Sequence, residues 1–178
     1  MIDISNDPWI TTYSGRQFFI TRATVDDIYI EDIAHGLSNI CRYVGQCKVF
    51  YSVAEHSVRM CELAPDNLKL PVLLHDASEA YLGDLSSLVK HFLPLYKKME
   101  DYLLNVIFAK YSIKWDPAIK TLDEWIRAPE VLSLFPAHSG WVLNRSGGER
   151  DYSDIVPWYP KRAEKKFLKM FKRLYKGK

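Results

Sequence analysis

The sequence predicts an all-α helical bundle, preceded by a short N-terminal hairpin or irregular arm. The β-prone stretch QFFI lies in the first 30 residues, close to a Ser14-Gly15 turn signal. After it, apolar residues recur at the three-and-four spacing of helices that bury one face. The chain has 178 residues, of which 48% are hydrophobic, so it can bury one core and is expected to form a single domain over residues 1–178.

The arm is expected over residues 8–30, and the first two helices follow it. The first helix is expected to begin at Ile30 and to end near Gly45. Six of its side chains share one apolar face: Ile30, Ile33, Ala34, Leu37, Ile40 and Cys41. The second helix is expected over residues 52–63, because Pro65 cannot continue it.

Three more helices are predicted in the middle of the chain. The third spans residues 68–82 and stops at Gly83, and the fourth lies between residues 94 and 111. The fifth covers residues 116–135. It begins at Asp116-Pro117, where a capping residue precedes proline, and Pro129 is expected to kink it.

The last part of the chain is predicted as a loop followed by a basic helix. Residues 138–157 have the composition of a loop. Residues 161–178 hold nine Lys or Arg and one Glu, a net charge of +8 that leaves residues 1–160 at −6. Within them, residues 161–176 are expected to form an amphipathic helix, with Phe167, Leu168, Phe171 and Leu174 or Tyr175 on its apolar face. This helix either docks on its own domain or a neighbouring subunit, or presents its basic face to a nucleotide, nucleic acid or membrane surface.

Composition also indicates the compartment. The cysteines Cys41, Cys47 and Cys61 are odd in number and lack CxxC spacing, which favours a reducing environment over a disulfide framework. The start MIDISNDPWI lacks the pattern of a signal peptide, and no apolar run is long enough to span a membrane. We therefore expect a cytoplasmic protein, of the cell or of an infected host, with no membrane partner.

A cluster of ionisable residues lies on the predicted inward face of the third helix. Glu79 is one turn beyond both His75 and Asp76, and the apolar Val72 and Leu73 are one turn before them. An unpaired carboxylate on that face would cost several kcal/mol, on the order of 2–7, or would have to be protonated. A bound cation is one of the few partners that removes this cost.

Two other helices point metal-capable side chains inward. His56 shares a stripe with Val53, Met60 and Leu63, and Asp123 is bracketed by apolar residues of the fifth helix. Taken singly, an inward histidine is more often a hydrogen-bonded core residue, and an inward aspartate a cap or an ion-pair partner. Candidates that converge from three helices favour a metal site.

Two imidazoles and two carboxylates form a mixed nitrogen and oxygen ligand set. This set suits one divalent transition-metal ion, such as Co, Mn or Zn, with Fe, Ni and Mg as alternatives, better than the oxygen cages that Ca prefers. Four protein ligands leave room at a six-coordinate ion for water and a substrate oxygen. Glu79, close by, could take a proton from an attacking water.

The sequence resembles the HD-superfamily phosphohydrolases, which are named for an adjacent His-Asp pair such as residues 75–76. Within them it resembles the group that holds bacterial 5′-deoxynucleotidases and small phage dATP or dNTP triphosphohydrolases. The matching segments are ICRY at 40–43, YSVAEHS at 51–57, LLHDASEAYLGDLSSLVK at 73–90 and IKTLDEWIRAPE at 119–130. They lie in the family's order across a motif core of about residues 30–135, so the resemblance implies an HD-domain helical bundle.

The resemblance also implies roles for individual residues. It implies that His56, His75, Asp76 and Asp123 bind the metal and that Glu79 is the general acid/base. It places Arg42, Asp84, Lys90 and Lys120 against the nucleotide or its phosphates. Tyr43 could stack on a base or simply pack at a helix end. Relatives often carry prolines in the strip that follows Asp84, where this chain has Ser86 and Leu88. That strip is expected to line the base and sugar pocket.

The expected activity is hydrolysis of deoxynucleotides at the α-phosphorus. A dATP-type triphosphohydrolase that releases deoxynucleoside and triphosphate is expected first, because Lys90 and Lys120, with Arg16, Lys97 or Lys98 in reserve, could hold a long phosphate chain. The alternatives are a 5′-deoxynucleotidase acting on dNMPs and, in another class, a nucleic-acid-binding or regulatory module. The presence of Glu79 beside four ligands argues against this last alternative, because a structural metal site does not need a base. Nucleic acid is therefore not the expected partner. Homo-oligomers are expected from the resemblance, and His35 is expected to be structural rather than to face substrate.

Overall fold

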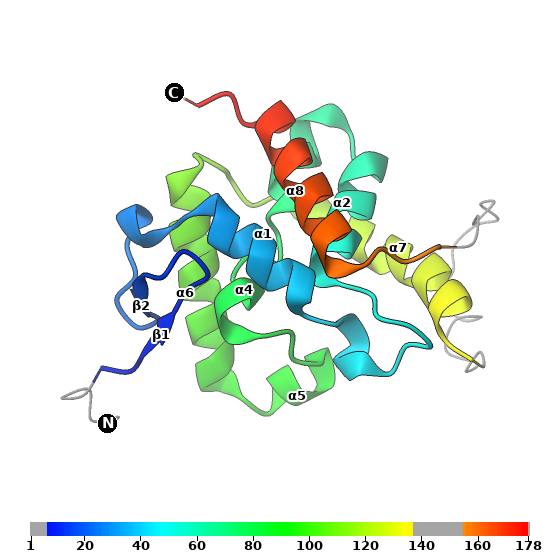
Figure 1. The fold of residues 1–178 in the computed structure, drawn as a ribbon, viewed down its shortest axis with the longest axis horizontal. Helices are drawn as coiled ribbons and strands as arrows, with labels where there is room; N and C mark the ends of the chain where they lie inside the picture. Colours follow the sequence, from blue (N-terminus) through cyan, green and yellow to red (C-terminus); the bar gives the residue numbers. More distant parts are fainter. Residues whose placement is uncertain (1–6, 137–154, 178) are drawn as a thin grey trace.

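The computed structural model describes residues 7–136 and 155–177, which form an all-α fold with a small N-terminal hairpin (Figure 1). The predicted fold class is therefore confirmed. The strands are β1 (Trp9–Thr11) and β2 (Gln17–Phe19). The helices are α1 (Ile30–Asn39), α2 (Val53–Leu63), α3 (Lys69–Leu73), α4 (Glu79–Leu82), α5 (Ser87–His91), α6 (Pro94–Lys110), α7 (Ala118–Leu134) and α8 (Pro160–Leu174), with 3-10 turns η1 (Val25–Asp27), η2 (Arg42–Gly45) and η3 (Asp66–Leu68). In these parts of the chain no helix has both the length and the apolar character needed to cross a bilayer.

The hairpin is anchored to the bundle at both its turn and its second strand. β1 and β2 pair antiparallel, with Trp9 opposite Phe19. The turn between them is fixed to α1, because the backbone N–H and the hydroxyl of Ser14 both donate to the Asp32 carboxylate. Phe18 of β2 is buried and stacks on Tyr81 of α4, with ring centroids 4.0 Å apart. The hairpin expected from the Ser14-Gly15 turn is thus part of the fold.

The first helix is shorter than the sequence predicts. α1 ends at Asn39, and the segment expected to continue it to Gly45 instead becomes extended and then turns. The reason is a backbone pairing between distant residues: Val53 N–H donates to Ile40 O and Arg42 N–H donates to Tyr51 O. This pairing leads the chain back into α2, which Ser52 caps by accepting a bond from the Glu55 N–H.

The third predicted helix is broken where its ionisable residues begin. α3 ends at Leu73, and α4 starts only at Glu79. The His75 ring nitrogen Nδ1 lies 2.8 Å from the Val72 carbonyl, which would accept the next helical backbone bond. The backbone continues instead with bonds between residues three apart, such as His75 to Val72. The expectation that His75, Asp76 and Glu79 share one helix was therefore wrong.

The later elements follow the sequence more closely. α6 and α7 agree with the fourth and fifth predicted helices, and α7 continues as one helix through Pro129. The sequence did not predict α5, a helix of five residues capped by Ser86. Most of the loop expected at 138–157 lies outside the described residues.

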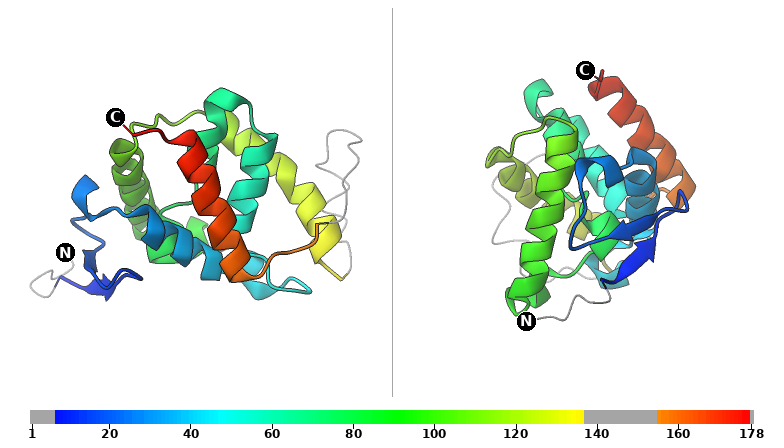
Figure 2. Two further views of the ribbon diagram at one scale, coloured as in Figure 1. Left: turned by 45° about the horizontal axis from the view of Figure 1, so that its top comes forward. Right: turned by 90° about the vertical axis from the view of Figure 1, so that its left-hand side faces the viewer.

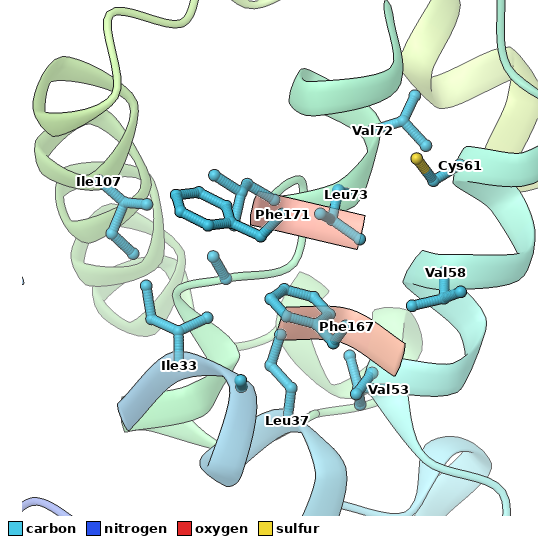
Figure 3. Close-up of a cluster of buried hydrophobic side chains, with 14 of the residues drawn as sticks. Ile33, Leu37, Val53, Val58, Cys61, Val72, Leu73, Ile107, Phe167 and Phe171 are labelled. Carbon is cyan, nitrogen blue, oxygen red and sulfur yellow. The ribbon is translucent and has the colours of Figure 1, made fainter. Parts of the chain in front are cut away.

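The hydrophobic core lies between α8, α6 and the helices of the first half of the chain. α8 packs against α1, α2 and α3, and Figure 2 shows it lying beside them. Phe167 and Phe171 point inward from α8 among Leu37, Val53 and Leu73 (Figure 3). The helix therefore docks on its own domain, as one of the two interpretations of its pattern expected. This packing fixes α2, which also carries a candidate metal ligand.

Candidate metal centre

His56 is held in one orientation within α2. Its ring has no exposed surface, and its Nδ1 lies 2.7 Å from Oε1 of Glu130 on α7. Because the Glu130 carboxylate only accepts, Nδ1 carries the hydrogen, so the neutral ring keeps its lone pair on Nε2. A neighbouring carboxylate that fixes the tautomer of a histidine in this way is typical of metal ligands.

His75 is oriented by the backbone rather than by a carboxylate. It lies in the turn between α3 and α4, and its Nδ1 is 2.8 Å from the Val72 carbonyl oxygen. A carbonyl cannot donate, so Nδ1 donates and the lone pair is again on Nε2. The break in the predicted helix thus positions this imidazole.

Two carboxylates complete the cluster. Ligand atoms of His56, His75 and Asp123 all lie within 4.8 Å of one another, and Asp123 Oδ1 is 3.3 Å from His56 Nε2. Asp76 Oδ2 lies 3.1 Å from His75 Nε2 and 3.8 Å from His56 Nε2. The structure therefore brings all four predicted ligands into one neighbourhood, and His56, His75 and Asp123 form a group that could hold a metal ion.

The donor atoms of this cluster fit a divalent cation. Among the described residues, Nε2 of His56 and Nε2 of His75 are buried without a hydrogen-bond partner. A buried nitrogen left unpaired costs on the order of 1–3 kcal/mol. A cation that accepts both lone pairs and both carboxylates removes this cost, and mixed nitrogen and oxygen ligands suit Mn, Co, Fe, Ni or Zn.

The charges of the cluster stabilise one another even without an ion. Burial opposes ionisation of Asp76, but the neighbouring His75 and His56 hold the pKa of its carboxyl below the usual value. The pKa of Asp123 is lowered for the same reason, through His56. Burial and the Arg42 guanidinium disfavour a charged His56, yet Glu130 and Asp123 outweigh them and raise the pKa of His56 to about 9. Without an ion Nε2 therefore carries a proton at neutral pH, and a metal that binds there displaces it.

Glu130 was not singled out by the sequence analysis, although it ends the segment IKTLDEWIRAPE. Its side chain has no exposed surface and accepts bonds from four donors: His56, Tyr51, Tyr43 and Arg42. Burial opposes its ionisation, but His56 and Arg42 lower the pKa of Glu130 to about 2. Its position seven residues after Asp123, two helical turns along the same face, was the signal that could have identified it.

Glu79 lies beside the cluster with one oxygen paired and one free. Its Oε1 accepts from Lys90 Nζ at 3.0 Å, and Lys90 also donates to Glu100. In the described part of the chain its buried Oε2 has no partner. Burial and repulsion from Asp76 and Asp84 raise the pKa of Glu79 well above its usual value. A buried carboxyl with a raised pKa in a pocket is a candidate for proton transfer.

The turn η2 carries Arg42 and Tyr43 into the site in an unusual backbone conformation. Tyr43 (φ 57°) and Val44 (φ 54°) are both in the left-handed region, which is rare for a residue such as valine. The Arg42 guanidinium is buried, with nitrogens 3.5 Å from Asp76, 3.8 Å from Asp123 and 3.5 Å from Glu130. Strain of this kind clusters at functional sites.

A pocket of about 420 Å³ opens beside these residues, a size typical of sites for small molecules. It is lined by the predicted ligands Asp76 and Asp123, by Glu79, and by four residues predicted to face substrate: Arg42, Tyr43, Asp84 and Lys90. Ser86 of the predicted strip lines it too, and the sequence analysis missed Arg127 and Phe135.

The structure does not bring every predicted contact to this pocket. Leu88 is 76% exposed on α5, and Lys120 is exposed one turn before Asp123; neither lines the wall. The reserve cations are also elsewhere, since Arg16 lies over the Tyr29 ring and Lys97 pairs with Glu100 and Asp101. Residue spacing could not show which side chains line the pocket. It predicts the face of the helix on which a residue lies, but not which other elements that face meets.

His35 occupies a separate place between the hairpin and α8. Its ring stacks on Tyr13 at 3.7 Å between centroids, and its Nδ1 lies 3.2 Å from Glu164 Oε2. It does not line the pocket. These contacts join the hairpin turn, α1 and α8.

The chain is similar to bacterial proteins whose names state no activity. The chain is 36% identical over 169 residues to the uncharacterized protein YfdR of Escherichia coli strain K12, covering 93% of this chain and 95% of that protein. It is also 36% identical over 137 residues to the uncharacterized protein RCAP_rcc00048 of Rhodobacter capsulatus, covering 70% of this chain and 68% of that protein. No protein-family model matches the chain.

Proposed function

The chain belongs to the protein family of Escherichia coli YfdR, and we propose that this member is an HD-type, metal-dependent phosphohydrolase that acts on deoxynucleotides. One observation carries the proposal: two oriented imidazoles, whose buried Nε2 atoms have no hydrogen-bond partner among the described residues, meet two carboxylates beside a pocket that holds an acid/base candidate. The HD motif segments of the sequence support the same reaction class.

In this proposal His56, His75, Asp76 and Asp123 hold a divalent ion. When bound, such an ion supplies a Lewis acid for a phosphoryl oxygen and lowers the pKa of water. Arg42 lies near Asp76 and Asp123 and limits the repulsion between them. The four side chains can therefore keep this arrangement both with and without a bound cation.

Glu79 is the proposed proton acceptor. Its Oε2 is the unpaired oxygen, while Lys90 holds Oε1 and so fixes the carboxyl plane. Water attacks the α-phosphorus and gives a proton to Glu79, and the bond from phosphorus to the 5′ oxygen breaks. Glu79 then returns that proton to the departing 5′ oxygen. The products are a deoxynucleoside and phosphate, or triphosphate from a longer substrate.

The pocket wall offers groups for each part of a nucleotide. Arg42, Lys90 and Arg127 supply positive charge for phosphate oxygens from η2, α5 and α7. Asp84 can accept a bond from a sugar hydroxyl. Phe135, which meets the Tyr43 ring edge to face, offers an aromatic surface for the base.

The length of the phosphate chain separates two candidate substrates. A dNTP is supported by the sequence resemblance and by cations that stand on different walls of the pocket. A dNMP is supported by charge, because the described pocket wall has three cations and four carboxylates. Arg42 already lies near Asp76, Lys90 near Glu79 and Arg127 near Asp123. We give the dNTP first and the dNMP as the second candidate.

The test is a substrate panel. The protein is incubated with dNMPs, dNDPs and dNTPs of all four bases in the presence of Mn, Co, Zn or Mg, and products are separated chromatographically. Saturable release of deoxynucleoside supports the proposal, and the inorganic product identifies the substrate length. Failure of every substrate and metal pair to release deoxynucleoside would refute it.

A further inference from the structure

Glu130 connects two parts of the site that carry different functions. Its carboxylate is fully buried, and its two oxygens have different partners. Oε1 accepts from His56 Nδ1 at 2.7 Å and from the Tyr51 hydroxyl at 2.8 Å. Oε2 accepts from the Tyr43 hydroxyl and faces Arg42 Nη2 at 3.5 Å. One oxygen thus faces the candidate metal ligand and the other faces η2.

The Oε1 side determines which nitrogen of His56 is available to a metal. Because this oxygen accepts the hydrogen bond from Nδ1, Nε2 is the nitrogen left for a metal, and it lies 3.3 Å from Asp123 and 3.8 Å from Asp76. Tyr51, itself buried, holds the same oxygen from another direction. The carboxylate cannot rotate away from His56 without losing both bonds.

The Oε2 side holds the substrate loop, which we define as residues Arg42–Gly45 of η2. Two consecutive residues of this loop, Tyr43 and Val44, are left-handed, a conformation that costs free energy unless other contacts offset it. The bond from Tyr43 to Glu130 is such a contact. It ties the loop to α7, the helix that also carries Asp123 and Arg127.

We propose that Glu130 is a positioning residue that couples metal binding to the substrate loop, through His56 on one oxygen and through Tyr43 and Arg42 on the other. The proposal rests on the proposed function. Glu130 itself does not line the pocket, so it acts only through these neighbours. A metal that fixes His56 fixes the same carboxylate that holds the loop.

The central test is Glu130→Gln, which keeps the size of the side chain but removes its charge and one acceptor. Metal affinity is measured by titrating the apoprotein with Co²⁺ and following visible absorption. We expect an affinity about 10-fold to 100-fold weaker than wild type, with a changed Co²⁺ spectrum, because a less basic and less constrained His56 is a poorer ligand. We also expect a raised KM for the deoxynucleotide identified by the panel.

Two single-atom variants separate the two oxygens. Tyr51→Phe removes a donor from Oε1 only and should weaken Co²⁺ binding strongly and, through the shared carboxylate, raise KM by a smaller factor. Tyr43→Phe removes a donor from Oε2 only and should raise KM by about 10-fold and, through the shared carboxylate, weaken Co²⁺ binding by a smaller factor. If Glu130→Gln fails to fold by circular dichroism, this pair decides the proposal alone.

The outcomes also distinguish this proposal from the proposed function. Two results overturn the coupling while turnover stands. The first is a Co²⁺ affinity and spectrum that are unchanged in folded Glu130→Gln. The second is a pair of tyrosine variants that each change one readout and leave the other at its wild-type value. Wild-type protein that binds Co²⁺ but releases no deoxynucleoside refutes the proposed function and the substrate half of the coupling, and Co²⁺ affinities still decide the metal half. Wild-type protein that binds no Co²⁺ overturns both.

Discussion

The two interiors of this molecule are stabilised in different ways. The apolar core beneath α8 brings Phe167 and Phe171 against α1, α2 and α3 (Figure 3). The polar interior beside it surrounds Glu130 and His56, whose side chains both have no exposed surface. α2 contributes to both, with Val53 in the first and His56 in the second.

The two interiors differ in how many of their buried polar atoms lack a hydrogen-bond partner. The apolar core depends on close packing, and among its described side chains the Tyr81 hydroxyl is the one buried polar atom without a hydrogen-bond partner. In the polar interior, four buried polar atoms in the described residues have no partner: Nε of Arg42, Nε2 of His56, Nε2 of His75 and Oε2 of Glu79. Buried polar atoms without a partner are rare in natural proteins, so the polar interior is suited to bind a ligand or an ion that pairs with them.

The largest expected effect concerns the polar interior alone. Glu79→Gln should lower kcat by about 10²-fold to 10⁴-fold, because the amide cannot accept the proton from water. Co²⁺ affinity should remain near wild type, since Glu79 is not a proposed ligand. The measurement is deoxynucleoside release at saturating substrate, together with a Co²⁺ titration.

Glu100→Gln is the matched control for this variant. Glu100 is also a buried acid bonded to Lys90, but it does not line the pocket, so its loss should affect turnover far less. Loss of bound Co²⁺ in Glu79→Gln would show that Glu79 is a ligand rather than a base.

The next largest effect tests the apolar core. Phe167→Ala should reduce the free energy of unfolding by about 3–5 kcal/mol, because a fully buried ring is replaced by a cavity. Urea denaturation measures it, and Phe92→Ala, at a ring that is 78% exposed, should change it by no more than about 0.5 kcal/mol. Similar losses in the two variants would show that the core beneath α8 is not packed as described.

Metal addition should stabilise the protein through the polar interior. Free Co²⁺ at about 1,000 times its dissociation constant should raise the free energy of unfolding by about 4 kcal/mol, because the ion binds the folded state. A chelator should reverse this gain in the free energy of unfolding. In His75→Ala, Co²⁺ should give no such gain, even if the variant is less stable than wild type without the ion. Denaturation with and without Co²⁺ measures this. A gain of the same size in His75→Ala would place the ion elsewhere.

The smallest effects compare two buried tyrosines. Tyr51→Phe should cost about 1.5–3 kcal/mol, because its hydroxyl donates to the charged Glu130. Tyr81→Phe should be neutral or stabilising, because in the described residues the buried Tyr81 hydroxyl has no hydrogen-bond partner. Denaturation of the apoproteins measures the pair, and a larger loss in Tyr81→Phe would contradict the assignment.

The sequence predicted the helices better than the connections between them. α2, α6 and α7 follow from apolar spacing and from local stop and start signals such as Ser52 and Pro94. The early end of α1 and the break after Leu73 did not follow, since each depends on a bond that local spacing does not reveal. At the end of α1, the Arg42 N–H donates to the Tyr51 carbonyl. After Leu73, the His75 ring donates from Nδ1 to the Val72 carbonyl.

The sequence by itself determined the helical class, the amphipathic face of α8 and the identity of the four candidate ligands, because these depend on residue type and on short-range periodicity. Only the tertiary structure decided that Glu130 holds His56 across 74 positions of the chain, that Arg127 joins the pocket and that Leu88 and Lys120 do not. The physical reason is that a helix fixes which side chains share a face. Which faces meet, and which buried charges pair, depends on how the helices pack.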